Sequence, residues 1–201
     1  MFIADMGSGN SCRNSLEYAK RMVRSLTEID TRQYDVVIKW QLFEKAGDNI
    51  PLSRDLFAKI HEFTWGLGYD TTASVFDEVS LNFLLRFPIP WIKLANRRDL
   101  DWMRDRIPDG VRVIQSVDKP ALFQEDCMCC VSRYPAVPSD YERMFDAEHL
   151  RRGLSDHTKN WKLFKKYQPE IYECHFVIEH SDENPDGKAF ARTPNDLREI
   201  L

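Results

Sequence analysis

The sequence predicts a single compact α/β domain over residues 1–201, in which eight parallel strands and eight helices close into a (β/α)₈, or TIM, barrel. Short apolar runs rich in β-branched residues alternate with helix-like segments, which indicates a parallel sheet. The alternation repeats eight times in 201 residues, at the lower limit of length for such a barrel. No linker or low-complexity tract divides the chain. An open doubly wound sheet is the alternative, although it usually has fewer strands.

The first four strand–helix units follow from apolar spacing. In the first helix, Leu16, Ala19 and Val23 fall on one face. Ser53 is a plausible N-cap of the second helix. The predicted pairs of strand and helix are 2–5 with 15–26, 35–40 with 53–65, 69–76 with 77–87, and 91–96 with 99–107.

The last four units repeat the same order. The final helix has a start signal, because Thr193 can cap it and Pro194 suits its first position. The fifth unit is the least regular, with only a short helix near 119–124. The predicted pairs are 111–116 with that short helix, 127–132 with 139–150, 152–158 with 160–167, and 171–177 with 193–201.

Charge and hydropathy exclude some partners. The net charge is −4 and no basic stripe is interleaved with aromatic residues, which argues against nucleic acid. No apolar stretch is long enough to span a bilayer, so we expect no membrane partner. The N-terminal "MFIADMGSGN" has no basic region before its apolar run, so we expect no signal peptide.

The five cysteines are Cys12, Cys127, Cys129, Cys130 and Cys174. Three of them crowd into the strand-like "CMCCVS", but no second CxxC-type pair completes a tetrahedral metal site. Reduced core thiols are therefore favoured over a metal site, and a cytoplasmic location fits them best.

Polar side chains gather where the predicted strands end, which is where barrels of this kind build their active sites. Several ends carry two polar residues separated by one, so both side chains point the same way. These pairs are Lys39 with Gln41, Ser132 with Tyr134, Ser155 with His157, and Glu173 with His175; Asp5, Lys93 and Ser116 end three further strands. Each alone could be a solvated side chain or a helix cap. Their joint placement at one end of seven strands predicts a functional pocket.

The stretch "GLSDHT" places Ser155, Asp156 and His157 side by side, but not as a catalytic triad. Adjacent strand residues point to opposite sides, so Asp156 is expected to face away, orienting its neighbours or capping the next helix. His157 and His175 end neighbouring strands and could reach one divalent ion. Two imidazoles with open positions suit Mn²⁺, Fe²⁺, Co²⁺ or Zn²⁺ better than Mg²⁺. Two ordinary histidines are the alternative.

An ordered set of motifs makes the sequence recognisable from about residue 2 to its end. The segments are "FIADMGSGN", "VVIKWQ", "WIKLAN", "CVSRYPAVPSDYE", "GLSDHT" and "YECHFVIEH" with "NPDGKAFARTPNDL". Together they resemble the catalytic barrel of the N-acetylneuraminate (sialic acid) synthase family. The resemblance implies a transferase of sialic acid-type carbohydrate biosynthesis. Such an enzyme condenses phosphoenolpyruvate with an N-acetylated hexosamine such as N-acetylmannosamine, giving a nine-carbon 2-keto acid sugar and phosphate.

The resemblance also implies roles for the metal and the acid–base groups. His157 and His175 match the two protein ligands of a divalent metal, usually Mn²⁺, with Mg²⁺ or Co²⁺ possible. Asp5 stands where the family has a glutamate, a candidate for activating the water that attacks C2 of phosphoenolpyruvate. Glu173 is the second catalytic carboxylate.

The resemblance further implies which residues bind the substrates. Matches to the phosphate and carboxylate site of phosphoenolpyruvate are Lys39, Gln41, Lys93, Ser116 and Ser155. Tyr134 and Asp186 match residues on the sugar side, and Ser132 stands where an asparagine is common. Fixed cations and hydrogen-bond donors suit a trianionic substrate in a partly dry pocket.

Departures from the family pattern keep alternatives open. The family usually has Glu-x-Gly-x-Asn-His at the first strand, whereas this chain has Asp5 and, at the histidine position, Asn10. Asn96 replaces a usual serine, and Asn49 is a weak match to a sugar-binding asparagine. Most members also continue into an antifreeze-protein-like domain that contributes an arginine to a partner subunit, and we expect none here. Because the family is generally dimeric, the resemblance implies a homodimer or a separate partner subunit. The alternatives are an accessory barrel that binds phosphoenolpyruvate and metal, or a different metal-dependent aldol-type reaction.

Overall fold

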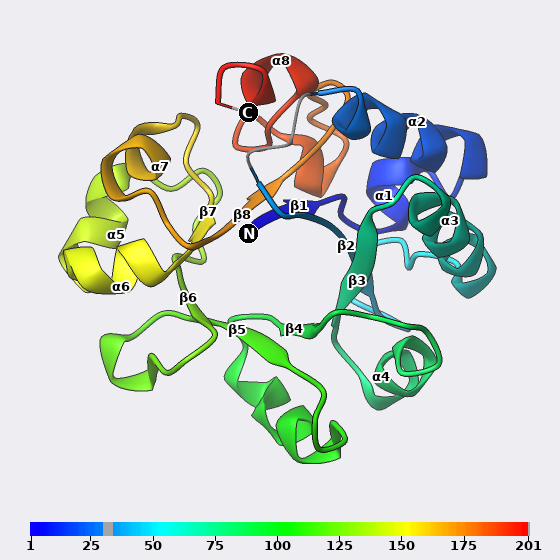
Figure 1. Cartoon of the computed structure of the whole chain (residues 1–201), viewed down its shortest axis with the longest axis horizontal. Coiled ribbons are helices and arrows are strands. Elements are labelled where there is room, and N and C mark those ends of the chain that lie inside the picture. Colours follow the sequence, from blue (N-terminus) through cyan, green and yellow to red (C-terminus); the bar gives the residue numbers. More distant parts are fainter. Residues whose placement is uncertain (30–33, 201) are drawn as a thin grey trace.

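Eight parallel strands form a closed barrel in the computed structural model, which describes residues 1–29 and 34–200 (Figure 1). The strands pair in chain order, and β1 pairs with β8 to close the ring. The predicted (β/α)₈ barrel is thereby confirmed. The strands are β1 (Phe2–Asp5), β2 (Val36–Leu42), β3 (Asp70–Val75), β4 (Ile92–Leu94), β5 (Val113–Val117), β6 (Cys127–Cys130), β7 (Gly153–Asp156) and β8 (Ile171–His175).

Helices lie outside the ring of strands (Figure 1). The α-helices are α1 (Gly9–Cys12), α2 (Leu16–Thr27), α3 (Arg54–Gly66), α4 (Glu78–Leu84), α5 (Pro138–Met144), α6 (Ala147–Arg152), α7 (Lys162–Tyr167) and α8 (Pro194–Leu197). Three 3₁₀ helices are η1 (Arg98–Arg106), η2 (Pro120–Leu122) and η3 (Pro185–Gly187). The predicted caps are confirmed, since Ser53 accepts a hydrogen bond from the first turn of α3 and Thr193 from that of α8.

The prediction of one continuous helix over 139–150 is wrong, because the segment forms two helices, α5 and α6. Phe145 leaves the helical region with φ −130° and ψ 144°. The next residue, Asp146, then caps α6 by accepting a hydrogen bond from the backbone N of His149 at 2.9 Å. Aspartate is a strong N-cap, so a new helix starts where the pattern predicted an unbroken one.

Two further helices differ from the prediction. The segment predicted over 99–107 is the 3₁₀ helix η1, in which buried Leu100 and Met103 lie three residues apart, the spacing that three residues per turn keeps in line. Helix α8 ends at Leu197 rather than running through 193–201, and Leu201 lies outside the described residues.

Inward-facing side chains form two layers along the barrel. The layer nearer the start of the strands is apolar and buried, and consists of Ile3, Val37, Trp91, Ile114 and Met128. Two residues further along the same strands stand Asp5, Lys39, Lys93, Ser116 and Cys130, which line the barrel mouth. Because side chains alternate along a strand, one face carries both the apolar floor and the polar site above it.

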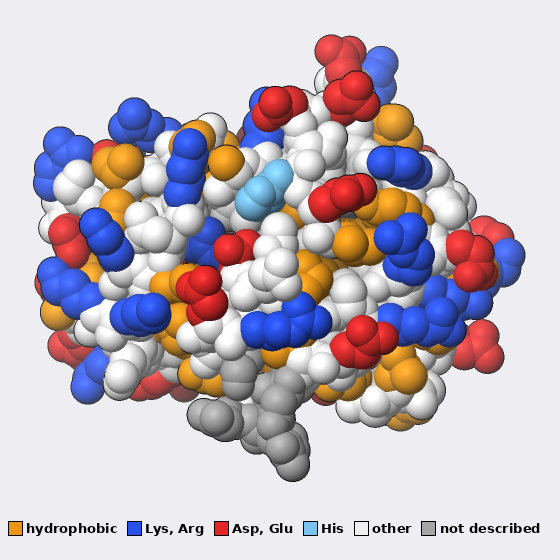
Figure 2. Space-filling model, turned by 90° about the horizontal axis from the view of Figure 1, so that it is seen from above, with side chains coloured by type: hydrophobic (Ala, Val, Ile, Leu, Met, Phe, Trp, Pro, Cys, Tyr) orange, Lys and Arg blue, Asp and Glu red, His pale blue; other side chains and the backbone are white. Residues whose placement is uncertain are grey.

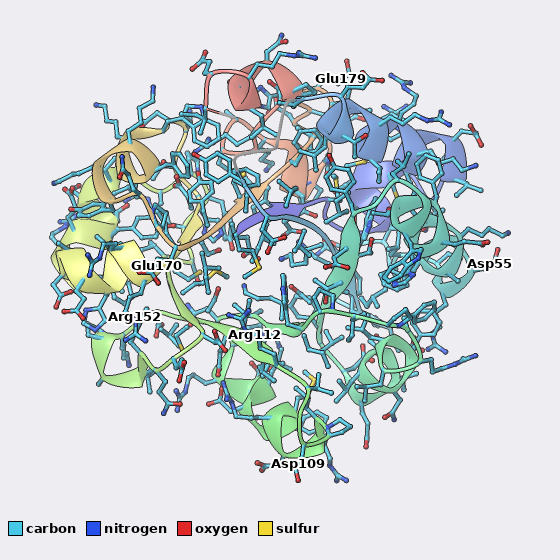
Figure 3. All side chains as sticks on the ribbon, in the orientation of Figure 1. Asp55, Asp109, Arg112, Arg152, Glu170 and Glu179 are labelled. Atoms are coloured by element: carbon cyan, nitrogen blue, oxygen red, sulfur yellow. The ribbon has the colours of Figure 1, made fainter. Side chains whose placement is uncertain are left out.

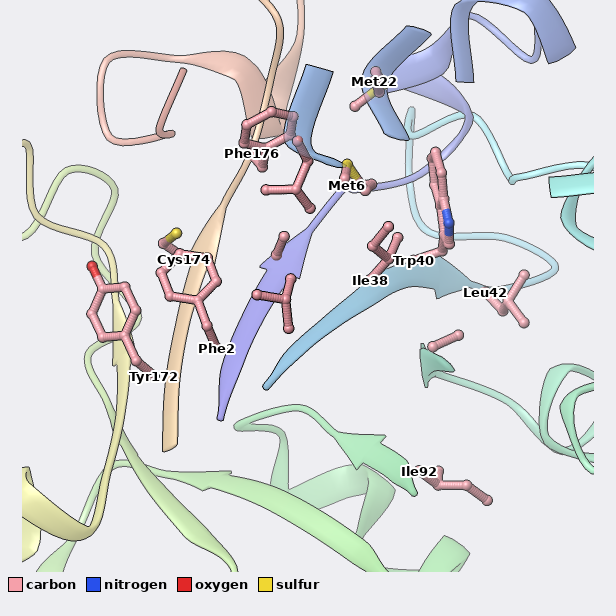
Figure 4. Packing of buried hydrophobic residues seen from close by; sticks show 14 of the residues in the cluster. Phe2, Met6, Met22, Ile38, Trp40, Leu42, Ile92, Tyr172, Cys174 and Phe176 are labelled. Carbon is pink, nitrogen blue, oxygen red and sulfur yellow. The ribbon is translucent and has the colours of Figure 1, made fainter. Parts of the chain in front are cut away.

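The opposite faces of the strands pack beneath the helices and form the main core. Figure 4 shows Phe2, Ile38 and Trp40 on β1 and β2, and all three are buried. Strands β6 and β7 lie close together at Gly153, where a Cβ atom would lie 2.4 Å from the carbonyl oxygen of Cys127. Glycine is required at this position because a side chain would push the two strands apart.

The outer surface is charged, with both signs mixed. Asp55 on α3 and Asp109 after η1 lie at the periphery of the barrel (Figure 3). On the face seen in Figure 2, positive and negative side chains are interspersed. Among residues 1–29 and 34–200, no helix has the length and apolar character to cross a bilayer.

Candidate active site

A cavity of about 420 Å³ opens at the C-terminal ends of the strands, where the sequence predicted a pocket. Every predicted site residue lines it: Asp5, Lys39, Gln41, Lys93, Ser116, Ser132, Tyr134, Ser155, His157, Glu173, His175 and Asp186. The strand register brings them together, because Asp5 on β1 lies level with Lys39 on β2 and with His175 on β8. Asn49, the weak match, is exposed and does not line the cavity.

Glu173 lies between two buried lysines at the centre of the site. Its Oε2 is 3.1 Å from Nζ of Lys39, and its Oε1 is 3.1 Å from Nζ of Lys93. The hydroxyl of Ser155 donates a further hydrogen bond to Oε1 at 2.8 Å. Burial raises the pKa of Glu173, but the two ammonium groups outweigh it and hold the pKa below its usual value. The carboxylate is therefore ionised at neutral pH.

The two lysines differ in how many of their three N–H donors are used. Lys39 uses all three N–H donors, because its Nζ lies 2.9 Å from Asp5, 3.1 Å from Glu173 and 3.0 Å from Ser74 Oγ. Burial lowers the pKa of Lys39, but the two carboxylates together raise it above its usual value.

Lys93 contacts only Glu173 and Ser116 Oγ, the latter at 2.8 Å, among the described residues. Burial is the main influence on this ammonium group, and it lowers the pKa of Lys93. One donor of Lys93 is left for another acceptor.

Asp5 is held by its neighbours on both oxygens. Oδ1 accepts a hydrogen bond from the backbone N of Gly7 at 3.0 Å, and Oδ2 accepts one from Gln41 at 3.0 Å and contacts Lys39 at 2.9 Å. His175 Nδ1 lies 3.6 Å from the same Oδ2. In this arrangement the short carboxylate orients Lys39 and Gln41.

His157 is fixed as a neutral ring. Its Nδ1 lies 2.7 Å from the carbonyl oxygen of Val131 and donates its proton there, which leaves Nε2 without a proton. Burial and, next, the neighbouring His175 lower the pKa of His157 to about 3. The ring therefore stays neutral, as a metal ligand must.

His175 faces two carboxylates. Its Nδ1 lies 3.4 Å from Asp186 Oδ1 and 3.6 Å from Asp5 Oδ2. Burial lowers the pKa of His175, but Asp5 and Asp186 together raise it. The buried Nδ1 makes no hydrogen bond of good geometry within the described part of the chain, so its contact with the two carboxylates is mainly electrostatic.

The histidine pair fits the predicted divalent cation. The ring centroids lie 5.5 Å apart. With metal–nitrogen bonds of about 2.1 Å, two imidazoles of one ion have centroids roughly 5 to 6 Å apart. Each Nδ1 faces an oxygen, the arrangement that orients a ring for ligation through Nε2. In residues 1–29 and 34–200 no three His, Cys, Asp or Glu side chains form a metal-binding group, so substrate or water would complete the coordination.

The residues that the resemblance assigns to sugar binding lie at the rim of the cavity. Tyr134 is half-exposed and its ring stacks against His157 with centroids 4.2 Å apart. Ser132 is exposed and accepts a hydrogen bond from Asn96 at 3.1 Å. Asp186 accepts hydrogen bonds from Ser11 and Gln41, both at 3.4 Å.

Sequence reasoning missed several lining residues. Ser74 alternates with Thr72 on β3 and with Phe76 just after it, but this strand does not end on a charged residue that would have indicated a site. Lys188 and Phe190 alternate with Asp186, a spacing that could have found them, although no strand lies there. Arg97, at the rim, is ion-paired with Asp99.

The comparisons with known proteins concern the fold. No family model and no curated protein matches the chain. Among solved structures, N-acetylneuraminic acid (sialic acid) synthetase from Leptospira borgpetersenii serovar Hardjo-bovis, in complex with citrate, has a TM-score of 0.78 and 20% identity, covering 98% of this chain and 80% of that chain. A protein described as spore coat polysaccharide biosynthesis protein E, from Chromobacterium violaceum ATCC 12472, has a TM-score of 0.75 and 17% identity, covering 98% and 71%.

A more distant structure has the same barrel. A truncated 3-deoxy-D-arabino-heptulosonate 7-phosphate synthase from Thermotoga maritima has a TM-score of 0.63 and 9% identity, covering 99% of this chain and 82% of that chain. The motif resemblance to sialic acid synthases is thus matched by the fold.

Proposed function

We propose that this barrel condenses phosphoenolpyruvate with the aldehyde of an N-acetylated hexosamine, giving a nine-carbon 2-keto acid sugar and inorganic phosphate. The observation that carries the proposal is the carboxylate of Glu173 held between the ammonium groups of Lys39 and Lys93 at the floor of the cavity. Buried cations with hydroxyl neighbours suit a small, highly charged anion. The paired histidines above them suit a polarised carbonyl group.

The phosphate and carboxylate of phosphoenolpyruvate bind the lysine side of the site. Lys93 has a donor to spare, and Ser116 and Gln41 line the same cavity. Lys39 is saturated by its own neighbours, so it serves chiefly to keep Glu173 and Asp5 in place. Substrate charge is thereby met by groups that are already oriented, which lowers the cost of binding.

The reaction forms one bond and breaks another. C3 of phosphoenolpyruvate attacks the aldehyde carbon, and the aldehyde oxygen takes up a proton to become a hydroxyl. Water adds at C2, the bond from C2 to the phosphate oxygen breaks, and C2 becomes a ketone. Asp5, which lines the cavity, accepts the proton of that water and passes it to the aldehyde oxygen, and the proton of the new C2 hydroxyl leaves with the phosphate. A divalent cation held by His157 and His175, Mn²⁺ in preference to Mg²⁺ or Co²⁺, would supply Lewis-acid polarisation of the aldehyde oxygen.

The neighbouring folds support this class of reaction. A sialic acid synthetase and a 3-deoxy-D-arabino-heptulosonate 7-phosphate synthase, both named as makers of sugar acids, share the barrel. The rim of the cavity supports a sugar as the second substrate, because Tyr134 offers an aromatic face and Asp186 a carboxylate.

Phosphate release tests the proposal. The purified protein is incubated with phosphoenolpyruvate, Mn²⁺ and a panel of N-acetylated amino sugars. Released phosphate is measured, and the sugar products are identified by mass spectrometry. We expect phosphate and a nine-carbon acid with at least one sugar. The variant Lys93→Met should lose this activity, whereas Lys59→Met, at an exposed ion pair on α3, should keep it. Binding of phosphoenolpyruvate without phosphate from any sugar would contradict the proposal and favour an accessory role.

A further inference from the structure

Arg192 lies behind the cavity wall, buried and outside the set of lining residues. Its guanidinium stacks over Trp161, 4.6 Å from the ring centroid. Four of its five N–H groups donate hydrogen bonds. The acceptors are the carbonyl oxygens of Thr158 at 2.8 Å, Asn160 at 3.0 Å and Phe190 at 3.1 Å, and Asp156 Oδ2 at 3.3 Å.

These bonds fix the residues on either side of His157. Asp156 is fully buried and faces away from the cavity, as predicted. It orients its neighbours rather than capping α7, since Oδ1 accepts from the backbone N of Thr158 at 2.8 Å and Oδ2 from the hydroxyl of Tyr172 at 2.9 Å. Arg192 contacts both Asp156 and Thr158, so its guanidinium fixes the chain that holds His157 between them.

The backbone of Arg192 fixes the other histidine. Its N–H donates to the carbonyl oxygen of His175 at 2.7 Å, and its carbonyl oxygen accepts from the backbone N of Val177 at 2.9 Å. The end of β8 is therefore attached to the same residue whose side chain holds the end of β7. One residue connects the two segments that carry the histidines.

The third attachment runs through Phe190. Arg192 donates to the carbonyl oxygen of Phe190, and the ring of Phe190 packs against both imidazoles. Its centroid lies 5.1 Å from that of His175 and 6.4 Å from that of His157. The hydrogen bond from Arg192 to Phe190 therefore reaches a residue whose ring contacts both histidines.

We propose that Arg192 is a positioning residue that sets the separation and orientation of His157 and His175 so that both can bind one divalent cation. The proposal deepens the proposed function and rests on it for the metal. Removing one partner of a buried ion pair destabilises the fold. A purely structural arginine would therefore change stability alone. A positioning arginine changes the histidines even where the fold is intact.

Two variants separate these roles. Arg192→Lys keeps the charge beside Asp156 but cannot reach the same four acceptors from one nitrogen, and Arg192→Met removes charge and hydrogen bonds together. Arg112→Met is the control, because Arg112 hydrogen-bonds the carboxylate of Asp126 and stands just before β5, at the end of the barrel away from the cavity. Circular dichroism and thermal unfolding establish whether each variant is folded. If Arg192→Met does not fold, Arg192→Lys alone tests the positioning role.

Mn²⁺ affinity is the first readout. Calorimetric titration with Mn²⁺ alone should give a Kd about 10-fold to 100-fold weaker in the Arg192 variants, as for other groups that orient metal ligands. The Arg112 variant should keep the wild-type Kd. A folded Arg192→Lys protein with wild-type affinity would overturn the proposal.

A second readout needs no metal. In ¹H–¹³C spectra of the metal-free protein, Arg192→Lys should displace the ring signals of His157 and His175 and leave those of His61 and His149, which lie on α3 and α6, unchanged. If the wild-type protein bound no Mn²⁺, the proposed metal-dependent function would fail, while these spectra would still decide the positioning role. Unmoved signals of both cavity histidines would refute it.

Discussion

Oε2 of Glu173 lies 3.1 Å from Nζ of Lys39, with both side chains almost fully buried. Carboxylate and ammonium reach the same level of the barrel from strands on either side of β1. Charges enclosed in this way interact strongly and depend on each other's presence. The following predictions start from this pair and its neighbours.

Removing Lys93 alone should destabilise the protein more than removing Lys93 together with Glu173. Lys93→Met takes one of the two cations from a buried carboxylate, and we expect the free energy of unfolding to fall by about 3 kcal/mol. The double variant Lys93→Met/Glu173→Gln should recover most of that loss but not phosphoenolpyruvate binding. Urea denaturation and calorimetry measure the two quantities. Equal stability of Lys93→Met and wild type would contradict the idea that Glu173 needs both lysines.

His157→Ala and His175→Ala should each abolish stabilisation by Mn²⁺. A ligand at 100 times its Kd stabilises the folded state by about 2.7 kcal/mol, which is measurable as a rise in Tm. His149→Ala, at a partly exposed histidine paired with Asp146 on α6, should retain the full Mn²⁺ effect. A chelator should reverse the effect in the wild-type protein. Retention of the Tm rise in either cavity variant would show that the ion binds elsewhere.

The metal-free protein should lose stability as the pH falls from about 6.5 towards 3 because of His157. The pKa of buried His157 is about 3 when folded, below the usual value of about 6.5 that applies once the chain unfolds. Between these values the unfolded chain binds a proton that the folded chain does not. The free energy of unfolding therefore decreases as the pH is lowered, by up to about 1.4 kcal/mol per pH unit. Urea denaturation in chelator should show a shallower dependence for His157→Gln. Identical slopes would mean that His157 is not held neutral.

Tyr141→Phe should destabilise the end of β7. The buried hydroxyl of Tyr141 accepts a hydrogen bond from the backbone N of His157 at 3.0 Å and donates one to the carbonyl oxygen of Ser155 at 2.6 Å. Leaving these groups unpaired costs about 1–3 kcal/mol in the free energy of unfolding. Tyr167→Phe, whose hydroxyl bonds an exposed Glu142, should change it by no more than about 0.5 kcal/mol. A similar effect of both changes would contradict the claim that the hydroxyl of Tyr141 stabilises the end of β7.

Gly153→Ala should weaken the contact of β6 and β7, and Gly66→Ala should not. A Cβ on Gly153 would meet backbone of Cys127 at 2.4 Å, whereas one on Gly66 would meet nothing within 4 Å. We expect a loss of about 1–3 kcal/mol for the first change and a gain of up to about 1 kcal/mol for the second. Thermal unfolding measures both. A neutral Gly153→Ala would mean that the strands can separate without cost.

The sequence was sufficient for the barrel and for many of the residues that line the cavity, because both follow from the alternation of side chains along strands. Residues such as Ile3 and Asp5, or Ile171 and Glu173, share one face of a strand, and the ends of parallel strands meet at one edge. Ser74 was not predicted to line the cavity, because a lone hydroxyl on a strand gives no signal until its partner Lys39 is known.

What sequence reasoning could not supply was the pairing within the cavity. The saturation of Asp5 by Gly7, Gln41 and Lys39 depends on the register of β1 against β2 and on rotamers, which no residue pattern encodes. The division of 139–150 into α5 and α6 turned on one capping residue, Asp146, inside a segment of otherwise helical spacing.

The pairing of β1 with β8 joins the first strand of the chain to the last. Asp5 lies level with His175 only across that seam, and Glu173 reaches Lys39 across it. A cut between β4 and β5 leaves Lys39 and Lys93 on the first piece and Glu173 with both histidines on the second, so neither piece holds the complete cavity until the two recombine. Phosphoenolpyruvate binding by separately expressed halves would therefore report on reassembly of the complete ring.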